Sequence, residues 1–237
     1  MYNYFKRFFD SLFSVIGASL LLPVLLPILL LLKLTAEGEI FYLQDRVGYK
    51  NKPFGIIKFA TMLKNSPNMG GKTVTVRNDP RITPIGKWLR ISKINELPQL
   101  INVLKGDMSL VGPRPLLPSS VQKYDPAVQA IIYQNRPGIT GIGSLVFRDE
   151  EKLVTECKKL GKDPMEYYKE HIYPYKGSLE TWYYYHISFF TDLKILMLTF
   201  ISLIYKDSDL VYKVFKNLPP KPESLSTEWI RKHFKQT

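Results

Sequence analysis

Two adjacent polar residues, Asn95 and Glu96, stand where a helix is expected to begin. A helix N-terminus presents free N–H groups and a positive dipole end, which together bind phosphate well. A glutamate there could also hold a divalent cation through its carboxylate, as magnesium sites on phosphate substrates require. The alternative is structural, with Asn95 as the N-cap and Glu96 as a first-turn acid favoured by the dipole. The pair alone leaves both interpretations open.

A second candidate is Arg114, which lies between Pro113 and Pro115. Its guanidinium presents a planar fork that grips phosphate oxygens bidentately, and the two prolines would reduce the entropy lost in placing it. A single arginine in a turn is most often only solvated, and the same holds for the other basic candidates. Together they would suit a diphosphate-bearing substrate near an anionic membrane; they are Arg46, Lys58, Arg90, Arg136 and Arg148.

The other reactive residue types offer little. The three histidines have no nucleophile pattern and no metal-ligand spacing beside them, so we interpret His171, His186 and His233 as structural or surface residues. Cys157 is the single cysteine, which excludes an intramolecular disulfide. The candidate chemistry therefore depends on carboxylate, amide and basic groups.

A short β-hairpin is expected to position Lys58. Residues 39–44 alternate weakly between apolar and polar, residues 46–53 have turn composition, and residues 54–59 resume an extended pattern. The polar residues 64–81 are then interpreted as a surface loop.

Two helices should position Arg90 and the Asn95-Glu96 pair. Pro84 opens the first, because proline is tolerated in the first turn of a helix. The second starts at Asn95 and continues with apolar residues at helical spacing until Gly106. Asp125-Pro126 and Asp163-Pro164 are further helix starts.

The N-terminal segment from Ser11 to Leu32 contains no charged residue and could just cross a hydrocarbon core of about 30 Å. Pro23 and Pro27 lie in its middle, where proline kinks or breaks a helix. Basic residues flank both ends, and positive flanks mark the cytoplasmic side. These features favour a re-entrant helix with its break at Pro23; a full span is the second interpretation and a cleaved signal peptide the third.

Two C-terminal segments also have a membrane-compatible composition. Residues 195–204 are strongly apolar but too short to span a bilayer, so they form either a core helix or an interfacial one. The tail after Pro220 mixes aromatic and basic residues, which suits a membrane surface or a solvated tail.

The chain is basic, with 33 Lys and Arg against 21 Asp and Glu and a formal net charge of +12. Such an excess suggests nucleic acid, an anionic membrane face or a phosphorylated substrate as partner. Nucleic acid is disfavoured, because the chain has a long apolar helix and no helix-turn-helix or RNA-binding signature.

The string from Glu96 to Pro115, ELPQLINVLKGDMSLVGPRP, closely resembles the signature of the bacterial sugar-transferase family, the monotopic polyprenyl-phosphate phosphoglycosyl transferases. Further blocks that resemble the family occur in the same order, so that the likeness extends over about residues 5–205. These blocks are residues 6–10, 44–48, 58–62, 136–141 and 192–195.

The resemblance implies a reaction in which a sugar-1-phosphate passes from a UDP-sugar to polyprenyl (undecaprenyl) phosphate and UMP is released. This reaction begins a surface glycan or an exopolysaccharide repeat unit. The implied cofactor is Mg²⁺, and the implied location is the bacterial cytoplasmic (inner) membrane, with the active domain on its cytoplasmic face. UDP-sugar, polyprenyl phosphate and anionic membrane lipid are the expected partners; a homodimer and other glycan-pathway enzymes are further candidates, and nucleic acid is not.

The resemblance also assigns residue roles. In the family an aspartate attacks the diphosphate and the adjacent glutamate binds magnesium; the glutamate matches Glu96, but the aspartate position holds Asn95, a far poorer nucleophile. The usual serine before the re-entrant proline is Leu22 here. The resemblance gives substrate-binding roles to Lys58, Arg90 and Arg114, and Glu180 stands in place of the family's aspartate. Arg136 and Arg148 are substrate-binding candidates by their charge, and Arg148 lies in residues 142–149, which depart from the family's tryptophan and Gly-Arg-Asn block.

The expected fold class is α+β. A re-entrant membrane helix would occupy residues 1–34, a small helix-rich catalytic domain with a short β-hairpin and interfacial amphipathic helices residues 35–205, and a basic tail residues 206–237. Two functions follow. One is an active transferase in which Glu96, with magnesium, carries more of the work, either as nucleophile or while the polyprenyl phosphate attacks directly. The other is a catalytically silent homologue that binds nucleotide sugar or lipid phosphate and scaffolds glycan-assembly enzymes.

Overall fold

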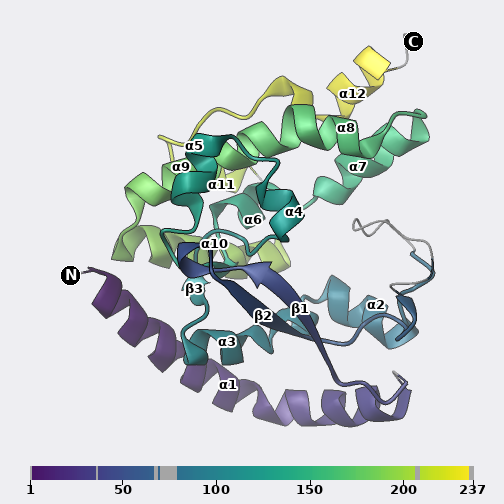
Figure 1. Ribbon diagram of the computed structural model, residues 1–237, viewed down its shortest axis with the longest axis vertical. Helices are drawn as coiled ribbons and strands as arrows, with labels where there is room; N and C mark the ends of the chain where they lie inside the picture. The colour runs from purple at the N-terminus through teal and green to yellow at the C-terminus, as the bar shows by residue number, and fades with distance from the viewer. Residues whose placement is uncertain (1, 36, 67–68, 70–78, 206–208, 235–237) are drawn as a thin grey trace. The chain divides into compact units, whose positions relative to one another are not determined.

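The computed structural model describes residues 2–35, 37–66, 69, 79–205 and 209–234 (Figure 1). The chain divides into two compact units. Unit 1 comprises residues 1–48 and 52–110, and unit 2 comprises residues 49–51 and 111–237. The described chain is rich in helices, has short strands and begins with one long apolar helix, which confirms these parts of the expected fold.

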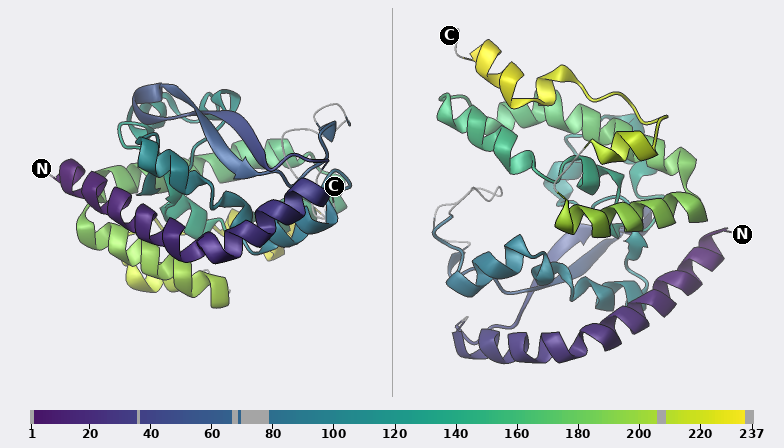
Figure 2. Two further views of the ribbon diagram at one scale, coloured as in Figure 1. Left: turned by 90° about the horizontal axis from the view of Figure 1, so that it is seen from below. Right: turned by 180° about the vertical axis from the view of Figure 1, so that it is seen from behind.

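Unit 1 begins with α1 (Tyr2–Thr35), a helix of 34 residues. Figure 2 shows it as one continuous ribbon, and the helix is not interrupted at Pro23 or Pro27. Its length and composition would allow it to cross a membrane, although signal sequences and buried core helices also meet that criterion.

The first half of α1 is tied to the rest of unit 1 by two charged side chains. Arg7 donates to the carbonyl oxygens of Val103 and Leu104 at the end of α3 (Gln99–Lys105), where helix carbonyls lack intrahelical partners. The carboxylate of Asp10 is buried and accepts from Ser109 Oγ at 2.7 Å and from the backbone N–H of Leu110 at 3.1 Å.

The far end of α1 packs on the same unit. Ile28 and Leu32 are buried together with Phe59 and Leu89 in one hydrophobic cluster. Between the two attached ends α1 exposes apolar side chains, among them Leu20 at 74% and Leu26 at 56%. The helix therefore has two docked ends and an apolar stretch that unit 1 leaves uncovered.

The predicted hairpin is confirmed. Strand β1 (Phe41–Val47) pairs antiparallel with β2 (Pro53–Phe59), with Tyr42 opposite Lys58. The strands are joined through the one-turn helix η1 (Tyr49–Asn51), where Lys50 and Asn51 have positive φ. Strand β1 continues three residues beyond the predicted end at residue 44.

The helices of unit 1 begin and end at the predicted proline and glycine, with one exception. Pro84 opens α2 (Pro84–Ile91), and Gly106, at φ 92°, ends α3. However, α3 begins at Gln99 and not at Asn95. Residues Ile94–Glu96 form the separate 3₁₀ turn η3, because the N–H groups of Glu96 and Leu97 bond three residues back instead of four.

Part of the segment predicted as a surface loop is buried. Asp79 is 6% exposed and Arg81 9%, and Arg81 Nε and Nη2 lie 2.9 and 2.6 Å from the two carboxylate oxygens of Asp79. Buried charges are tolerated when they are paired and hydrogen-bonded in this way. Residues 67–68 and 70–78 of the predicted loop lie outside the described residues.

In unit 2 the short helices α5 (Pro126–Ile132) and α6 (Ile142–Val146) pack against α9 (Tyr173–His186). Asp125 and Asp163 cap α5 and α8 as predicted, accepting from Ala127 N at 2.8 Å and Met165 N at 3.0 Å. The elements from residue 109 on are β3 (Ser109–Val111), α4 (Pro118–Val121), α5 (Pro126–Ile132), β4 (Gly138–Thr140), α6 (Ile142–Val146), α7 (Glu150–Lys159), α8 (Pro164–Tyr167), η4 (Tyr168–Ile172), α9 (Tyr173–His186), α10 (Phe189–Ile204), α11 (Leu210–Val214), η5 (Glu223–Leu225) and α12 (Thr227–Phe234).

The two C-terminal segments are both helical. Helix α10 buries Ile195 and Leu198 but exposes Phe190 at 70% and Phe200 at 68%, so only one side of it packs on the protein. The described tail is folded onto the protein, because Ile230 of α12 is fully buried and Arg231 Nε lies 2.7 Å from Glu156 Oε1 on α7, while Arg231, Lys232 and His233 are exposed.

Candidate active site

Glu96 and Lys58 form a direct ion pair in unit 1. Lys58 Nζ lies 2.8 Å from Glu96 Oε1, and each side chain keeps 17% of its surface exposed. Lys58 is on β2 and Glu96 ends η3, 38 residues along the chain. Two residues predicted separately are therefore brought together. The remaining exposure leaves the carboxylate accessible to a ligand.

Asn102 positions this ion pair. It is 1% exposed, and its side-chain amide donates to Gly55 O at 2.8 Å and accepts from Ile57 N at 3.0 Å. Because Asn102 lies on α3, just after η3, these bonds fix the register between α3 and β2. The same register places Glu96 against Lys58.

Asn95 contributes an unpaired oxygen beside Glu96. The residue is 8% exposed, and its buried Oδ1 has no hydrogen-bond partner among the described residues. An unsatisfied buried acceptor costs about 1–3 kcal/mol. Carboxylate and amide oxygens are ligands that Mg²⁺ accepts, and Mg²⁺ at phosphate sites often uses one or two carboxylates with substrate phosphates. Glu96 and Asn95 fit such an ion, although no group of three or more His, Cys, Asp or Glu occurs in the part of the chain described.

Arg90 belongs to a second group of charges in unit 1. Its Nη1 lies 3.4 Å from Thr61 Oγ1. Hydrogen bonds from Arg81 lower the pKa of Asp79, and the charge of Arg90 adds a smaller effect in the same direction. The polar composition of this segment does not predict Asp79 and Arg81 as site residues. Their one sequence signal is the spacing of an acid and a base on either side of Pro80.

The turn that carries Arg114 is tightly packed in unit 2. Pro113 and Pro115 are buried, whereas Arg114 between them is exposed. The N–H of Gly138 donates to Pro113 O at 2.9 Å, and a Cβ on Gly138 would lie 2.1 Å from Gly112 N. Glycine is therefore required where the two chain segments meet, and the turn presents a single charged side chain outward.

Glu180 lies beneath this turn and not at the surface. Its carboxyl is completely buried, and burial raises the pKa of Glu180 to about 8, even though the backbone N–H of Arg114 and the charge of Lys176 act in the opposite direction. The half-buried Lys176 pairs with Glu150 and lies over the Phe147 ring, 4.9 Å from its centroid. Burial lowers the pKa of Lys176. Sequence had given no sign of Lys176.

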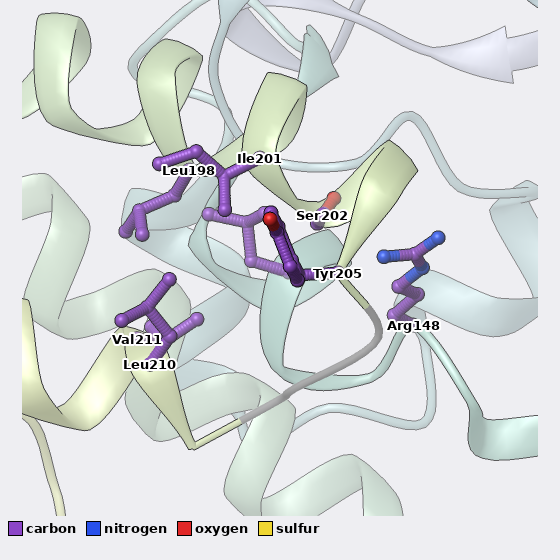
Figure 3. Close-up of a pocket in the computed structure, with 8 residues that line it drawn as sticks. Arg148, Leu198, Ile201, Ser202, Tyr205, Leu210 and Val211 are labelled. Atoms are coloured by element: carbon purple, nitrogen blue, oxygen red, sulfur yellow. The ribbon is translucent and has the colours of Figure 1, made fainter.

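The two remaining arginines lie in other surroundings of unit 2. The guanidinium of Arg136 lies over the Tyr49 ring, 4.8 Å from its centroid. Arg148 borders a small cavity of about 10 Å³, and its buried Nη1 has no partner among the described residues. Figure 3 shows Arg148 beside Ser202 and Tyr205, with apolar side chains of α10 and α11 on the other side of the cavity.

The predicted site residues thus form two sets, one in each unit. Each set contains exposed or partly exposed groups that a phosphate substrate could reach, among them Glu96 in unit 1 and Arg114 in unit 2. The sets are Lys58, Arg90, Asn95 and Glu96 in unit 1, and Arg114, Arg136, Arg148 and Glu180 in unit 2.

Comparisons with known proteins show which proteins this chain resembles. A family model described as bacterial sugar transferase matches residues 1–206. The UDP-N-acetylgalactosamine-undecaprenyl-phosphate N-acetylgalactosaminephosphotransferase of Aeromonas hydrophila is 41% identical over 148 residues, which are 62% of this chain and 35% of that protein. The UDP-glucose:undecaprenyl-phosphate glucose-1-phosphate transferase of Caulobacter vibrioides is 34% identical over 207 residues, 86% of this chain and 71% of that one.

A third relative is the exopolysaccharide production protein ExoY of Sinorhizobium fredii, 33% identical over 164 residues, which are 63% of this chain and 72% of that protein. The chain belongs to the bacterial sugar-transferase family. It spans only about a third of the length of the Aeromonas relative.

Proposed function

We propose that this protein transfers a sugar-1-phosphate from a UDP-sugar to polyprenyl phosphate and so starts a surface glycan or an exopolysaccharide. Membership of the family and the names of the relatives support this reaction class. The observation that carries the proposal is the Glu96 carboxylate, which is held by Lys58, partly exposed, and adjacent to the unpaired oxygen of Asn95.

Glu96 is the acid at the reacting centre. On one route a Glu96 oxygen attacks the β-phosphorus, the bond from that phosphorus to the bridging oxygen breaks, and UMP leaves with the electron pair. The polyprenyl phosphate then attacks the same phosphorus and regenerates the carboxylate. On the other route the polyprenyl phosphate attacks the β-phosphorus directly and UMP leaves with the electron pair of the broken bond to the bridging oxygen, while Glu96 would act only by helping to hold the cation. Asn95 is neutral and buried, so it serves neither route as nucleophile.

We propose Mg²⁺ as the cofactor, held by the Glu96 carboxylate and Asn95 Oδ1. When bound there, the ion would neutralise charge on the diphosphate. The basic residues would bind the remaining phosphate charge. Arg114 suits this role because the rest of its turn is buried while its own side chain is exposed.

The two docked ends of α1 support a re-entrant topology. A helix that crossed the bilayer would place its ends on opposite faces, about 30 Å apart. Arg7 and Asp10 at one end and Leu32 near the other all contact unit 1. We therefore propose that α1 enters and leaves the membrane on its cytoplasmic face, with the exposed face of α10 at the interface and the net charge of +12 against anionic lipid.

Topology is testable because the native Cys157 is fully buried and should react little. Single cysteines at Tyr4 and Leu34, which are 85% and 73% exposed, would be labelled from either side of sealed inverted vesicles. We expect both to react from the cytoplasmic side. Reaction from opposite sides would refute the re-entrant arrangement.

The activity is tested with purified protein in lipid nanodiscs, Mg²⁺, undecaprenyl phosphate and a panel of UDP-sugars. We expect release of UMP with at least one donor, and loss of that release in Glu96→Ala. The matched control is Glu39→Ala, which removes an exposed carboxylate of the same unit that pairs with Lys64 at 2.9 Å. Equal activity in the two variants would exclude Glu96 from the reaction.

The second candidate function is that of a catalytically silent homologue, which binds nucleotide sugar or lipid phosphate and scaffolds glycan-assembly enzymes. Its partners would be a second copy of the chain or other enzymes of the pathway. Asn95 is the observation that favours it, because the position lacks the carboxylate of the family. No turnover with any donor in the wild type, combined with turnover in Asn95→Asp, would decide for this second function.

A further inference from the structure

The main chain of Arg114 is held on its carbonyl side by a buried tyrosine. The Tyr133 hydroxyl donates to Arg114 O at 2.9 Å and accepts from the N–H of Leu116 at 3.0 Å. Tyr133 is 1% exposed and lies directly after α5. One hydroxyl therefore bonds two backbone groups on either side of Pro115.

The N–H side of Arg114 is held by Glu180. The backbone N–H of Arg114 is directed at the buried Glu180 carboxyl. That carboxyl also fills the space above Gly143, because a Cβ built on Gly143 would lie 2.7 Å from Glu180 Oε1. Glu180 on α9 thus lies against Gly143 of α6 as well as at the Arg114 turn.

The contrast in exposure indicates what these bonds achieve. Tyr133, Glu180, Pro113 and Pro115 are all buried, while Arg114 is exposed. Two prolines limit φ, the Tyr133 hydroxyl bonds the Arg114 carbonyl oxygen, and the Glu180 carboxyl lies at the Arg114 N–H, so the backbone under Arg114 is restrained. Fixing a ligand-binding group before the ligand arrives removes an ordering cost from binding.

We propose that Tyr133 and Glu180 are positioning residues that act through Arg114, fixing its main chain on both sides so that the guanidinium is presented to the diphosphate of a nucleoside diphosphate sugar. The identity of this ligand rests on the proposed function; the clamp itself rests on the contacts of unit 2. Neither side chain is expected to touch the substrate, which assigns Glu180 a role through Arg114 and not in direct substrate binding.

The test compares two tyrosine variants. Tyr133→Phe removes the hydroxyl that holds Arg114. Tyr175→Phe is the matched control, because Tyr175 is also buried and its hydroxyl also makes two hydrogen bonds, one to Tyr212 Oη at 2.9 Å and one to Pro219 O at 2.7 Å. Both variants lose the same kind of contact, but only one loses it at the Arg114 turn.

The probe is UDP, titrated calorimetrically into full-length protein in nanodiscs with Mg²⁺. We expect Tyr133→Phe to weaken UDP binding by about two- to tenfold, as the loss of one to two net hydrogen bonds allows, and Tyr175→Phe to leave it unchanged. In an Arg114→Ala background the Tyr133→Phe effect should vanish, because no guanidinium remains to be positioned. An equal loss in both tyrosine variants, or a loss that persists without Arg114, would overturn the proposal.

Two variants test the Glu180 side. Glu180→Gln keeps an oxygen that can accept from the Arg114 N–H and should bind UDP like the wild type. Glu180→Leu keeps a side chain of similar size without an acceptor and should weaken binding as Tyr133→Phe does. Equal binding by the two variants would remove Glu180 from the clamp.

Backbone amide exchange separates failure of the clamp from failure of the proposed function. Exchange at Leu116 should accelerate in Tyr133→Phe, and exchange at Arg114 in Glu180→Leu, whereas Tyr175→Phe should change neither. If the wild type binds no UDP, the proposed function fails and exchange still decides whether these side chains hold the turn. Unchanged exchange in both variants would overturn the clamp whatever UDP does.

Discussion

Replacement of Glu180 by glutamine should change how the stability of the protein depends on pH. The carboxyl is completely buried, and its pKa in the folded protein is raised from 4.5 to about 8. At a pH between these two pKa values, the Glu180 carboxyl has lost its proton in the unfolded chain but keeps it in the folded protein. The free energy of unfolding therefore falls as pH rises through this window, and it changes no further above the folded pKa. Glutamine resembles the protonated acid and has no proton to release.

The size of the effect follows from the pKa values. Each pH unit inside the window corresponds to about 1.4 kcal/mol, so the full interval from 4.5 to about 8 amounts to on the order of 5 kcal/mol. For a chain of this size a change of about 1 kcal/mol shifts the unfolding midpoint by about 2–4 °C. The wild type should therefore lose on the order of 10 °C, relative to Glu180→Gln, between pH 5 and pH 8.

The assay is thermal unfolding in nanodiscs followed by tryptophan fluorescence. A Trp88→Phe background leaves the two tryptophans of unit 2, Trp182 and Trp229, as reporters. Glu223→Gln, at an exposed position of the same unit, controls for the loss of a carboxylate as such. If the difference between the wild type and Glu180→Gln were the same at pH 5 and pH 8, the argument from burial would be refuted.

Three further variants test the packing. Gly138→Ala should destabilise unit 2 by about 1–3 kcal/mol or more, because the new Cβ would lie 2.1 Å from Gly112 N; normal stability in denaturant unfolding would refute this. Ile230→Ala should cost about 2–5 kcal/mol and expose α12 to limited proteolysis, and an unchanged cleavage pattern would contradict the docking of the tail. Asp10→Asn should cost about 1.5–3 kcal/mol by weakening the bond from Ser109, whereas wild-type stability would mean that the bond contributes nothing.

Sequence patterns predicted the secondary-structure elements that are determined by residues close together in the chain. The hairpin that carries Lys58 follows from alternation and turn composition, and the end of α3 follows from the left-handed conformation of Gly106. The start of α3 was predicted four residues early, because Asn95 and Pro98 suit both an α-helical first turn and the observed 3₁₀ turn. The burial of Asp79 and Arg81 was also not predicted, since a polar composition by itself indicates a surface.

The composition of the candidate site was partly predictable, but its contacts were not. Lys58 and Glu96 each matched a family motif, yet the ion pair between them depends on Asn102, which bonds β2 from a position 45–47 residues away. Tyr133 carried no signal, because its hydroxyl has meaning only beside Arg114, 19 residues earlier. Long-range hydrogen bonds of this kind exist only in the folded chain.

Whether phosphate moves together with the sugar is measured most directly with a UDP-sugar labelled with ³²P at its β-phosphate. In nanodiscs with Mg²⁺ and undecaprenyl phosphate, the label should pass into the lipid fraction while unlabelled UMP is released, and Glu96→Ala should abolish both. Transfer of the sugar with the label left in UDP would contradict the proposed reaction. Full transfer by Glu96→Ala would contradict the role of Glu96.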